Sequence, residues 1–380
     1  MKIEQSIFSE NQWTPKHSTD GFQSQEANLV LAFCGKDQLT IENINVLKEQ
    51  YPAAQVVSAT TAGEVYNDLL YENSIVATAI QFEKTEVKTV YANIKNCDSS
   101  YNLGKKLTAL FPQKGLKYIL VISDGNLING TDLVKGIKAS IDDNVLVTGG
   151  LAGDGDRFES TLVGLNEYID EGNVVLVGLY GDNIKVGHGS MGGWDEFGHE
   201  RTITKSNQNV LFELDGKSAL DLYKEYLGAY AEELPSSALL FPLSINSDEE
   251  GNRNVRTILS IDENEKSMTF AGNMPEGSKV RLMKANFDKL IDASNQAARL
   301  AVDSFDSKPD LALLISCVGR KLILNERVEE ELERAMEYFG EHTVTTGFYS
   351  YGEISPIMTL GKCELLNQTM TITTLTETLD

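Results

Sequence analysis

The sequence predicts an α/β (α+β) protein in which repeated β-α-β-β units form mixed sheets covered by helices, in two domains. Three observations predict this fold class. Similar apolar runs recur three times, a helical stretch follows each run, and a glycine-rich bend ending in an acid follows each helix. Because β-α-β steps favour parallel neighbours and β-β steps favour hairpins, the sheets are expected to be mixed.

The first element of each unit is a buried strand that stops at a glycine. Short apolar runs bounded by turn residues are typical of strands whose two faces are both covered. The three runs are NLVLAFCG (28–35), YILVISDG (118–125) and DLALLISCVG (310–319).

The second element is a helix, and the third copy is the clearest. Its apolar residues recur at helical spacing from Val328 to Phe339, and Gly340 follows as a candidate C′ residue. We expect the acidic run 329–331 on this helix to be solvated surface. Two more helices are predicted between the second and third units, over 217–227 and 286–305.

The third element is a second strand that runs into a bend and an acid. The bends read SATTAGE (58–64), TGGLAGD (148–154) and GFYSYGE (347–353), and a further strand closes each unit over 74–82, 173–180 and 369–375. The segments 238–243, 255–261 and 267–271 suggest a degenerate fourth copy.

The chain has 380 residues, of which 56 are acidic and 33 basic, so its formal charge is −23. Proteins that bind nucleic acid or anionic lipid need clustered Lys and Arg. We therefore expect neither kind of partner. Hydrophobic residues make up 41% of the chain, which is ordinary for a folded protein, so the acidity does not indicate disorder.

We expect an N-terminal arm over 1–26, a first domain over 27–220 and a second over 221–380. The sequence shows neither a signal-peptide h-region nor a run of ~20 apolar residues that would span a membrane. Its four cysteines have no CxxC spacing, which favours a reducing compartment. The expected location is the cytoplasm.

The repeated Gly-acid endings are candidate ligand contacts. Glycine lets a backbone approach a ligand closely, and an acid at a strand end can bind an amine or a hydroxyl. Each acid can equally cap a turn. For Glu64 we favour the cap, whereas for Asp154, which follows Gly153, and for Glu353 the two interpretations stay open.

Cys317 and Arg320 follow the apolar strand of the third unit. Cys317 can be a reactive thiol whose pKa Arg320 lowers, or a buried structural cysteine like Cys34, which has nearly the same place in the first unit. Arg320 can receive a ligand carboxylate or lock Glu353 in a salt bridge.

The glycine-rich segment 187–198 surrounds Trp194, which can form a pocket wall or a core residue. His188 and His199 flank Trp194 without the HExxH or CxxC spacing of a metal site, so we favour structural histidines.

Several segments together resemble the FIST family. Those similar to its N-terminal domain include GGLAGD (149–154), the stretch from TLVGL to MGGW (161–194), RTITK (201–205) and LFELDGKSALDLYKEYLG (211–228). Those similar to its C-terminal domain are FPL (241–243), PEGSKVRLM (275–283), SCVGR (316–320), GFYSYGEI (347–354) and NQTMTITTL (367–375).

The resemblance implies a stand-alone, bacterial-type sensory protein of signal transduction, which is not an enzyme. It would bind an amino acid or a similar small polar metabolite and signal through a separate kinase or cyclic-nucleotide enzyme. We expect the ligand beside the bends of the C-terminal domain. Arg320 would hold its acidic group and Glu353 its amino or hydroxyl group, with Tyr349, Tyr351 and Asn367 lining the pocket.

Two alternatives remain. One branch of the family implies a haem-binding nitric-oxide sensor that partners a histidine kinase or cyclic-nucleotide enzyme, with His188 or His199 as axial ligand. Leu366 stands where that branch often has histidine, so the leading interpretation has no cofactor. The other alternative is a hydrolase that uses Cys317 or the acids, which ranks last because no nucleophile has a base at a recognisable spacing.

Overall fold

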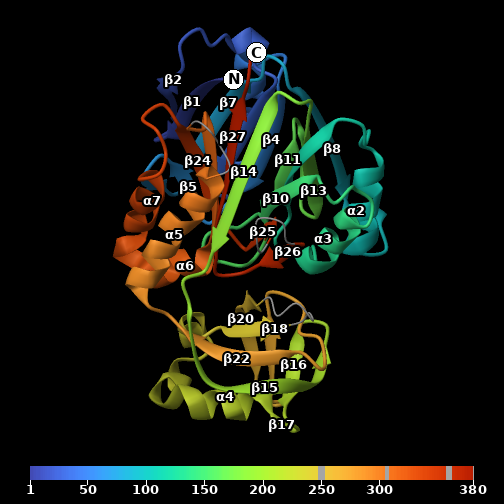
Figure 1. Cartoon of the computed structure of the whole chain (residues 1–380), viewed down its shortest axis with the longest axis vertical. Helices are drawn as coiled ribbons and strands as arrows, with labels where there is room; N and C mark the ends of the chain where they lie inside the picture. The colour runs from blue at the N-terminus through green and yellow to red at the C-terminus, as the bar shows by residue number, and fades with distance from the viewer. Residues whose placement is uncertain (247–252, 304–307, 357–361, 380) are drawn as a thin grey trace.

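The computed structural model describes residues 1–246, 253–303, 308–356 and 362–379. Across these residues the strands form sheets of seven, six, six and eight strands. Figure 1 shows three sheets packed together in a body that holds both termini, and the eight-stranded sheet in a smaller domain below it. The predicted class, with mixed sheets covered by helices in two domains, is confirmed.

Each sheet of the body is built round the strands of one predicted unit. The first strand of the unit pairs parallel with the second and antiparallel with the third. The three triplets are β3 (Leu29–Cys34), β4 (Gln55–Thr60) and β7 (Ile75–Gln81); β9 (Leu116–Ser123), β10 (Leu146–Leu151) and β13 (Asn173–Tyr180); and β23 (Leu311–Cys317), β24 (Val344–Ser350) and β27 (Met370–Glu377).

A short hairpin follows the second strand of each unit and joins the sheet of another unit. Strand β5 (Glu64–Tyr66) pairs with β24, β11 (Val163–Leu165) with β4, and β25 (Gly352–Pro356) with β10. This cyclic exchange ties the three units together. The outer strands of the hairpins are β6 (Leu69–Tyr71), β12 (Tyr168–Asp170) and β26 (Cys363–Leu366).

One more strand flanks the third strand of each unit. Strand β1 (Lys2–Ser9) pairs with β7 and with β2 (Gln12–Ser18), β8 (Glu86–Asn93) pairs with β13, and β14 (Ile184–Met191) pairs with β27. Residues 1–26, which the sequence suggests as an arm, thus supply two strands of a sheet.

The three sheets share one core, and helices cover their outer faces. Leu31, Leu120 and Leu313, one from each first strand, contribute to a common buried cluster. Burial on both faces explains why these strands are continuous apolar runs. The first sheet is covered by α1 (Ile41–Gln50), the second by α2 (Ser100–Ala109) and α3 (Gly130–Lys138), and the third by α5 (Phe287–Val302), α6 (Val318–Leu324) and α7 (Val328–Met336).

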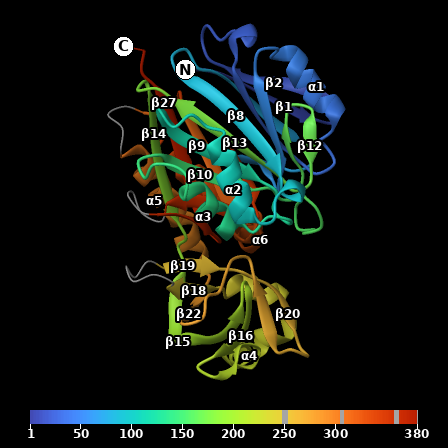
Figure 2. The same ribbon diagram turned by 90° about the vertical axis from the view of Figure 1, so that its right-hand side faces the viewer.

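The helices lie on separate flanks of the body. Figure 1 shows α5, α6 and α7 on one side and α2 and α3 on the other, and Figure 2 shows α1 beside the sheet that carries β1 and β2. Among the described residues, no helix is long and apolar enough to cross a membrane.

The smaller domain is an insertion between β14 and α5. It has its own buried core, which is formed by residues between 203 and 282. The expected boundary at residue 220 therefore falls inside this domain. Its elements are β15 (Asp195–Asn207), β16 (Val210–Leu214), β17 (Lys217–Ser218), α4 (Ala219–Leu227), β18 (Leu243–Asn246), β19 (Arg253–Arg256), β20 (Ile258–Asp262), β21 (Ser267–Phe270) and β22 (Lys279–Lys284).

The suggestion of a fourth β-α-β-β copy is wrong. The strands of that region, β18 to β21, form antiparallel pairs with one another and with β16 and β22. The parallel pair that defines a unit does not occur in the described part of this domain.

Candidate functional site

The three glycine-rich bends meet at one end of the body. The backbone N–H of Ala62 donates to the carbonyl of Tyr349 (2.8 Å), and that of Gly153 donates to the carbonyl of Thr60 (3.0 Å). A Cβ on Gly153 would lie 3.0 Å from the nitrogen of Ala62, so this glycine permits the close approach of two bends. The hairpin exchange therefore brings distant segments of the chain to one place.

A cavity of about 650 Å³ opens beside these bends, and we call it the bend cavity. Residues of all three units line it, because 35–37, 61–64, 70, 72 and 73 come from the first, 154–157 from the second, and residues of α6 and α7 from the third. The lining carries both signs of charge and an apolar part. Its charged side chains are Lys36, Asp37, Glu64, Glu72, Asp154, Asp156, Arg157, Lys321 and Glu329, and its apolar ones include Leu70, Val318, Leu322 and Val328.

Lys321 of α6 is a cation of the lining that contacts the first bend. Its Nζ donates to the carbonyl of Ala62 (2.7 Å) and forms an ion pair with Glu72 at the rim. The sequence drew attention to Arg320 instead. Successive residues of an α-helix point about 100° apart, so when Arg320 faces the core its neighbour faces the cavity.

Asp154 organises one wall of the cavity. Its carboxylate accepts hydrogen bonds from the backbone N–H groups of residues 158–160 (2.9–3.0 Å) and from the Tyr351 hydroxyl. Burial opposes its ionisation, but these donors outweigh burial and keep the pKa of Asp154 below its usual value. Because both oxygens are occupied, Asp154 shapes the loop, as a turn cap does.

Glu64 is buried where β5 begins. Its carboxylate accepts hydrogen bonds from the Thr61 hydroxyl (2.5 Å) and from both the N–H (3.1 Å) and the hydroxyl (2.7 Å) of Ser74. It therefore joins the bend to the start of the third strand.

Glu353 repeats this arrangement in the third unit. It accepts from the Ser350 hydroxyl (2.7 Å) and from the N–H (3.1 Å) and hydroxyl (2.8 Å) of Thr369. Burial is the largest influence on both carboxyls, and it raises the pKa of Glu64 and of Glu353 to about 7 despite the hydrogen bonds.

These two carboxyls should make the protein less stable as the pH rises. The pKa of an unfolded glutamate is about 4.3, so between about pH 4.5 and 7 the folded state holds protons that the unfolded state has released. The resulting stability is present below that window and is lost as the pH rises through 7. From pH 5.5 to 8, each carboxyl should lower the free energy of unfolding by on the order of 2 kcal/mol.

Urea unfolding of wild type and of the Glu64→Gln/Glu353→Gln variant at both pH values measures this effect. The double variant should lose clearly less stability than wild type over the same interval. Glu333→Gln, at an exposed position of α7, serves as the control and should keep the wild-type slope. Equal slopes for all three proteins would contradict the assignment.

Arg320 is fully buried and locked inside the third unit. Its guanidinium pairs with Glu331 and donates to the carbonyls of Gly192 (2.6 Å), Leu290 (2.7 Å) and Gln368 (3.4 Å). Glu331, not the expected Glu353, is thus its salt-bridge partner. With its N–H groups directed to these protein acceptors, Arg320 does not present a guanidinium to a ligand.

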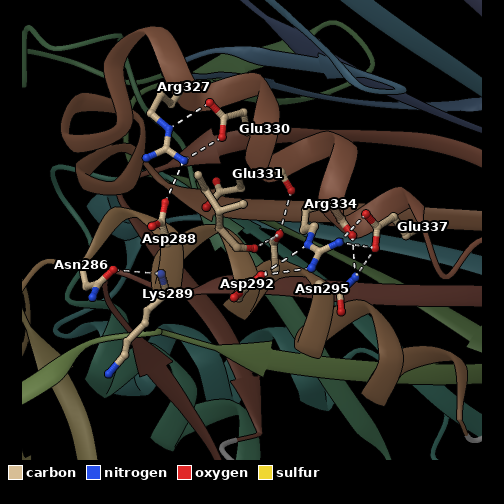
Figure 3. Close-up of polar contacts among 12 residues, drawn as sticks. Asn286, Asp288, Lys289, Asp292, Asn295, Arg327, Glu330, Glu331, Arg334 and Glu337 are labelled. Carbon is tan, nitrogen blue, oxygen red and sulfur yellow. Dashed lines mark hydrogen bonds and ion pairs between the residues drawn. The ribbon is translucent and has the colours of Figure 1, made fainter.

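The expectation that the acidic run 329–331 is solvated is wrong for Glu331. This side chain is fully buried and also accepts hydrogen bonds from the hydroxyls of Ser316 and Tyr349, both at 2.9 Å. Figure 3 shows the outer side of α7 and α5. There Arg327 contacts Asp288 of α5, and Arg334 contacts Asp292 of α5.

The remaining predicted residues lie close to the Arg320–Glu331 pair or to the bends. Burial, together with the nearby Glu353 carboxylate, raises the pKa of the Cys317 thiol well above its usual value, which is the reverse of activation. Trp194 donates from its indole nitrogen to the carbonyl of Gln368 (2.9 Å). Asn367 and Gln368 are buried, and their side-chain amides make no hydrogen bond within the described part of the chain.

Asp124 is a buried acid that was not predicted as a site residue from the sequence. It directly follows β9, and its N–H donates to the carbonyl of Asn173 as that of Cys317 donates to the carbonyl of Thr369. Its carboxylate accepts from the Thr161 hydroxyl (2.8 Å) and the Gly172 N–H (3.1 Å). It thereby joins hairpin to third strand, as Glu64 and Glu353 do. Its place between the apolar strand and Gly125 is the signal that points to it.

His188 and His199, the two candidate haem ligands, lie in different domains. His188 is buried in β14 of the body, in register with Thr373, whereas His199 is exposed on β15 of the smaller domain. Neither belongs to the lining of the bend cavity. In the described ranges, no group of three or more His, Cys, Asp or Glu side chains is arranged to hold a metal ion.

Comparison with known proteins identifies two family models. The model described as the FIST N domain matches residues 28–217, and the one described as the FIST C domain matches residues 219–356. FIST domains are associated with sensing in signal transduction.

Individual relatives are distant. The chain is 27% identical over 216 residues to the uncharacterized protein MJ1623 of Methanocaldococcus jannaschii, a match that spans 51% of this chain and 39% of that protein. Among solved structures, a cyanuric acid hydrolase from A. caulinodans aligns over 94% of this chain and 91% of its own, at 5% identity and a TM-score of 0.38. A likeness at that level supports no statement about activity.

Proposed function

The chain belongs to the FIST family, and from this membership we propose that it is a non-catalytic sensor that binds an amino acid or a similar small zwitterion in the bend cavity. It passes the signal to a separate signalling protein. The observation that carries the proposal is a cavity of ligand size in which cations, carboxylates and an apolar surface lie together.

Each part of an amino acid has a counterpart in the lining. Lys36, Lys321 and Arg157 suit a carboxylate, and Glu72 and Glu329 suit an ammonium group. Leu70 and Leu322 suit an aliphatic side chain. In this proposal the ligand contacts Lys321, the residue after Arg320 on α6. The raised pKa of the Cys317 thiol supports a role without nucleophilic catalysis.

The proposal is tested by thermal shift and calorimetry against a panel of L-amino acids at millimolar concentration. At least one should raise the melting temperature, because a ligand at 100 times its Kd stabilises the folded state by about 2.7 kcal/mol. The variant Lys321→Met, which keeps the aliphatic stem and removes the charge, should weaken binding of that amino acid at least tenfold.

The matched control is Lys266→Met, at an exposed lysine that is ion-paired with Asp221 in the smaller domain. It should bind like wild type. Two results would count against the proposal: no panel member stabilises the wild-type protein, or Lys321→Met and Lys266→Met bind the same compound with equal affinity.

A further inference from the structure

A second cavity, of about 800 Å³, lies between the body and the smaller domain, and we call it the interdomain cleft. On the body side it is lined by residues 125–130, which run from the loop after β9 into the start of α3, together with Phe158 and Tyr351. On the other side it is lined by residues of the small domain, including 258–259 and 270–272. Its volume lies in the range of small-molecule sites.

The lining of the cleft exposes apolar surface from both domains. Leu127 is 51% exposed, Phe158 is 46% exposed and Leu259 is 48% exposed, although all three are large and apolar. One such side chain on a surface is ordinary, but several around one concave site are typical of a binding site.

Phe158 is held in a strained conformation at this site. Its φ is +55°, a region that bulky residues rarely adopt. The Asp154 carboxylate (2.9 Å) and the Tyr351 hydroxyl (3.1 Å) accept its N–H, and its ring stacks on that of Tyr351 with centroids 4.5 Å apart. Such strain persists only where the surroundings impose it, and it is concentrated at functional sites.

The charge of the cleft differs from that of the bend cavity. Glu159 is the one carboxylate among the described lining residues, and neither lysine nor arginine is among them; the other polar side chains include the amides of Asn126, Asn129 and Asn209. A desolvated charge on a ligand would have no partner of opposite sign here except that one acid.

We propose that the interdomain cleft is a second binding site, which takes an uncharged, flat, ring-bearing small molecule. The ring stacks on the exposed part of Phe158, and the molecule contacts Leu127 of the body and Leu259 of the smaller domain at once. This site is independent of the amino-acid site in the bend cavity, since it has another lining and another ligand chemistry.

The test uses Nile red, a neutral, flat fluorophore, titrated into the folded 380-residue protein without amino acids. Saturable enhancement at one equivalent is expected. Phe158→Asn should weaken probe binding at least tenfold while leaving the melting temperature close to wild type, because asparagine accepts a positive φ. Leu127→Glu and Leu259→Glu should also weaken it, since each places a charge in the cleft.

The matched control is Leu110→Glu, which adds the same charge at a leucine that is 57% exposed and outside the cleft. It should bind the probe like wild type. The proposal is overturned if wild type shows no saturable binding, if Phe158→Asn binds as tightly as wild type, or if Leu110→Glu weakens binding as much as the cleft variants. None of these results bears on amino-acid binding, so the two proposals fail separately.

Discussion

Replacing Glu331 by alanine should lower the free energy of unfolding by about 3–5 kcal/mol, because it leaves the fully buried Arg320 guanidinium without its counter-charge. Two buried hydroxyls, those of Ser316 and Tyr349, lose their acceptor at the same time. Urea unfolding followed by circular dichroism measures the change. If the variant is too unstable to purify, Glu331→Gln, which keeps the shape and one carbonyl acceptor, should show a smaller loss in the same assay.

The preceding residue on the helix, Glu330, provides the control. Glu330 pairs with Arg327 on the exposed side of α7, and such surface pairs contribute about 1 kcal/mol or less. Glu330→Ala should therefore remain close to wild type. A similar, small loss for both alanine variants would show that the buried pair does not hold the third unit together.

Glu331 also shows how the sequence could have been interpreted better. Val328, Glu331, Leu332 and Ala335 are the buried residues of α7, and they follow the i, i+3, i+4, i+7 spacing of a core-facing stripe. Helical periodicity therefore placed this glutamate inside. Composition suggested the opposite, because three successive acids usually lie in solvent.

The fold was predictable where a pattern is local. Strands buried on both faces must be apolar throughout, so β3, β9 and β23 were visible as runs ending at turns, and the repeat connected them. The hairpin exchange was not predictable, because β5, β11 and β25 pair across units through backbone hydrogen bonds that leave little trace in side-chain order. The separate fold of the smaller domain was not predicted, because in the sequence its short antiparallel strands resemble those of a degenerate fourth copy.

The candidate site was predictable in its position along the chain and not in its side chains. The repeated bends do meet, and Gly153, Asp154 and Tyr351 lie there. Which of two neighbouring cations faces the cavity depends on the rotation of α6, which spans seven residues and is too short for its periodicity to be evident. The sequence therefore suggested Arg320 as a ligand contact, although it is Lys321 that lines the cavity.

The second large effect is expected from glycine in the middle of a strand. Gly347 of β24 lies in register with Leu314 of β23, and a Cβ on it would lie 1.8 Å from the carbonyl oxygen of Leu314. Gly149 of β10 has the same place against Val121, at 1.9 Å. Backbone atoms of a central strand cannot move aside as a side chain can, so the two strands would have to separate.

The same register position recurs in all three units and also faces a hairpin strand. The incoming hairpin places Val65 beside Gly347 and Ile354 beside Gly149. In the first unit the corresponding residue is Ser58, and there the hairpin strand supplies the small residue, Gly164. In every unit, therefore, one of the two facing positions is glycine.

Gly347→Ala should accordingly lower the free energy of unfolding by ~4 kcal/mol or more, which is the range of severe core substitutions. Gly178→Ala in β13 is the control. There the nearest atoms to a new Cβ are side-chain carbons of Tyr180 at 3.1 Å and Leu116 at 3.2 Å, which can shift, so a loss of about 1 kcal/mol is expected. Thermal and urea unfolding of both variants decide the matter: if Gly347→Ala is as stable as Gly178→Ala, β24 and β23 are not as closely apposed at Leu314 as described.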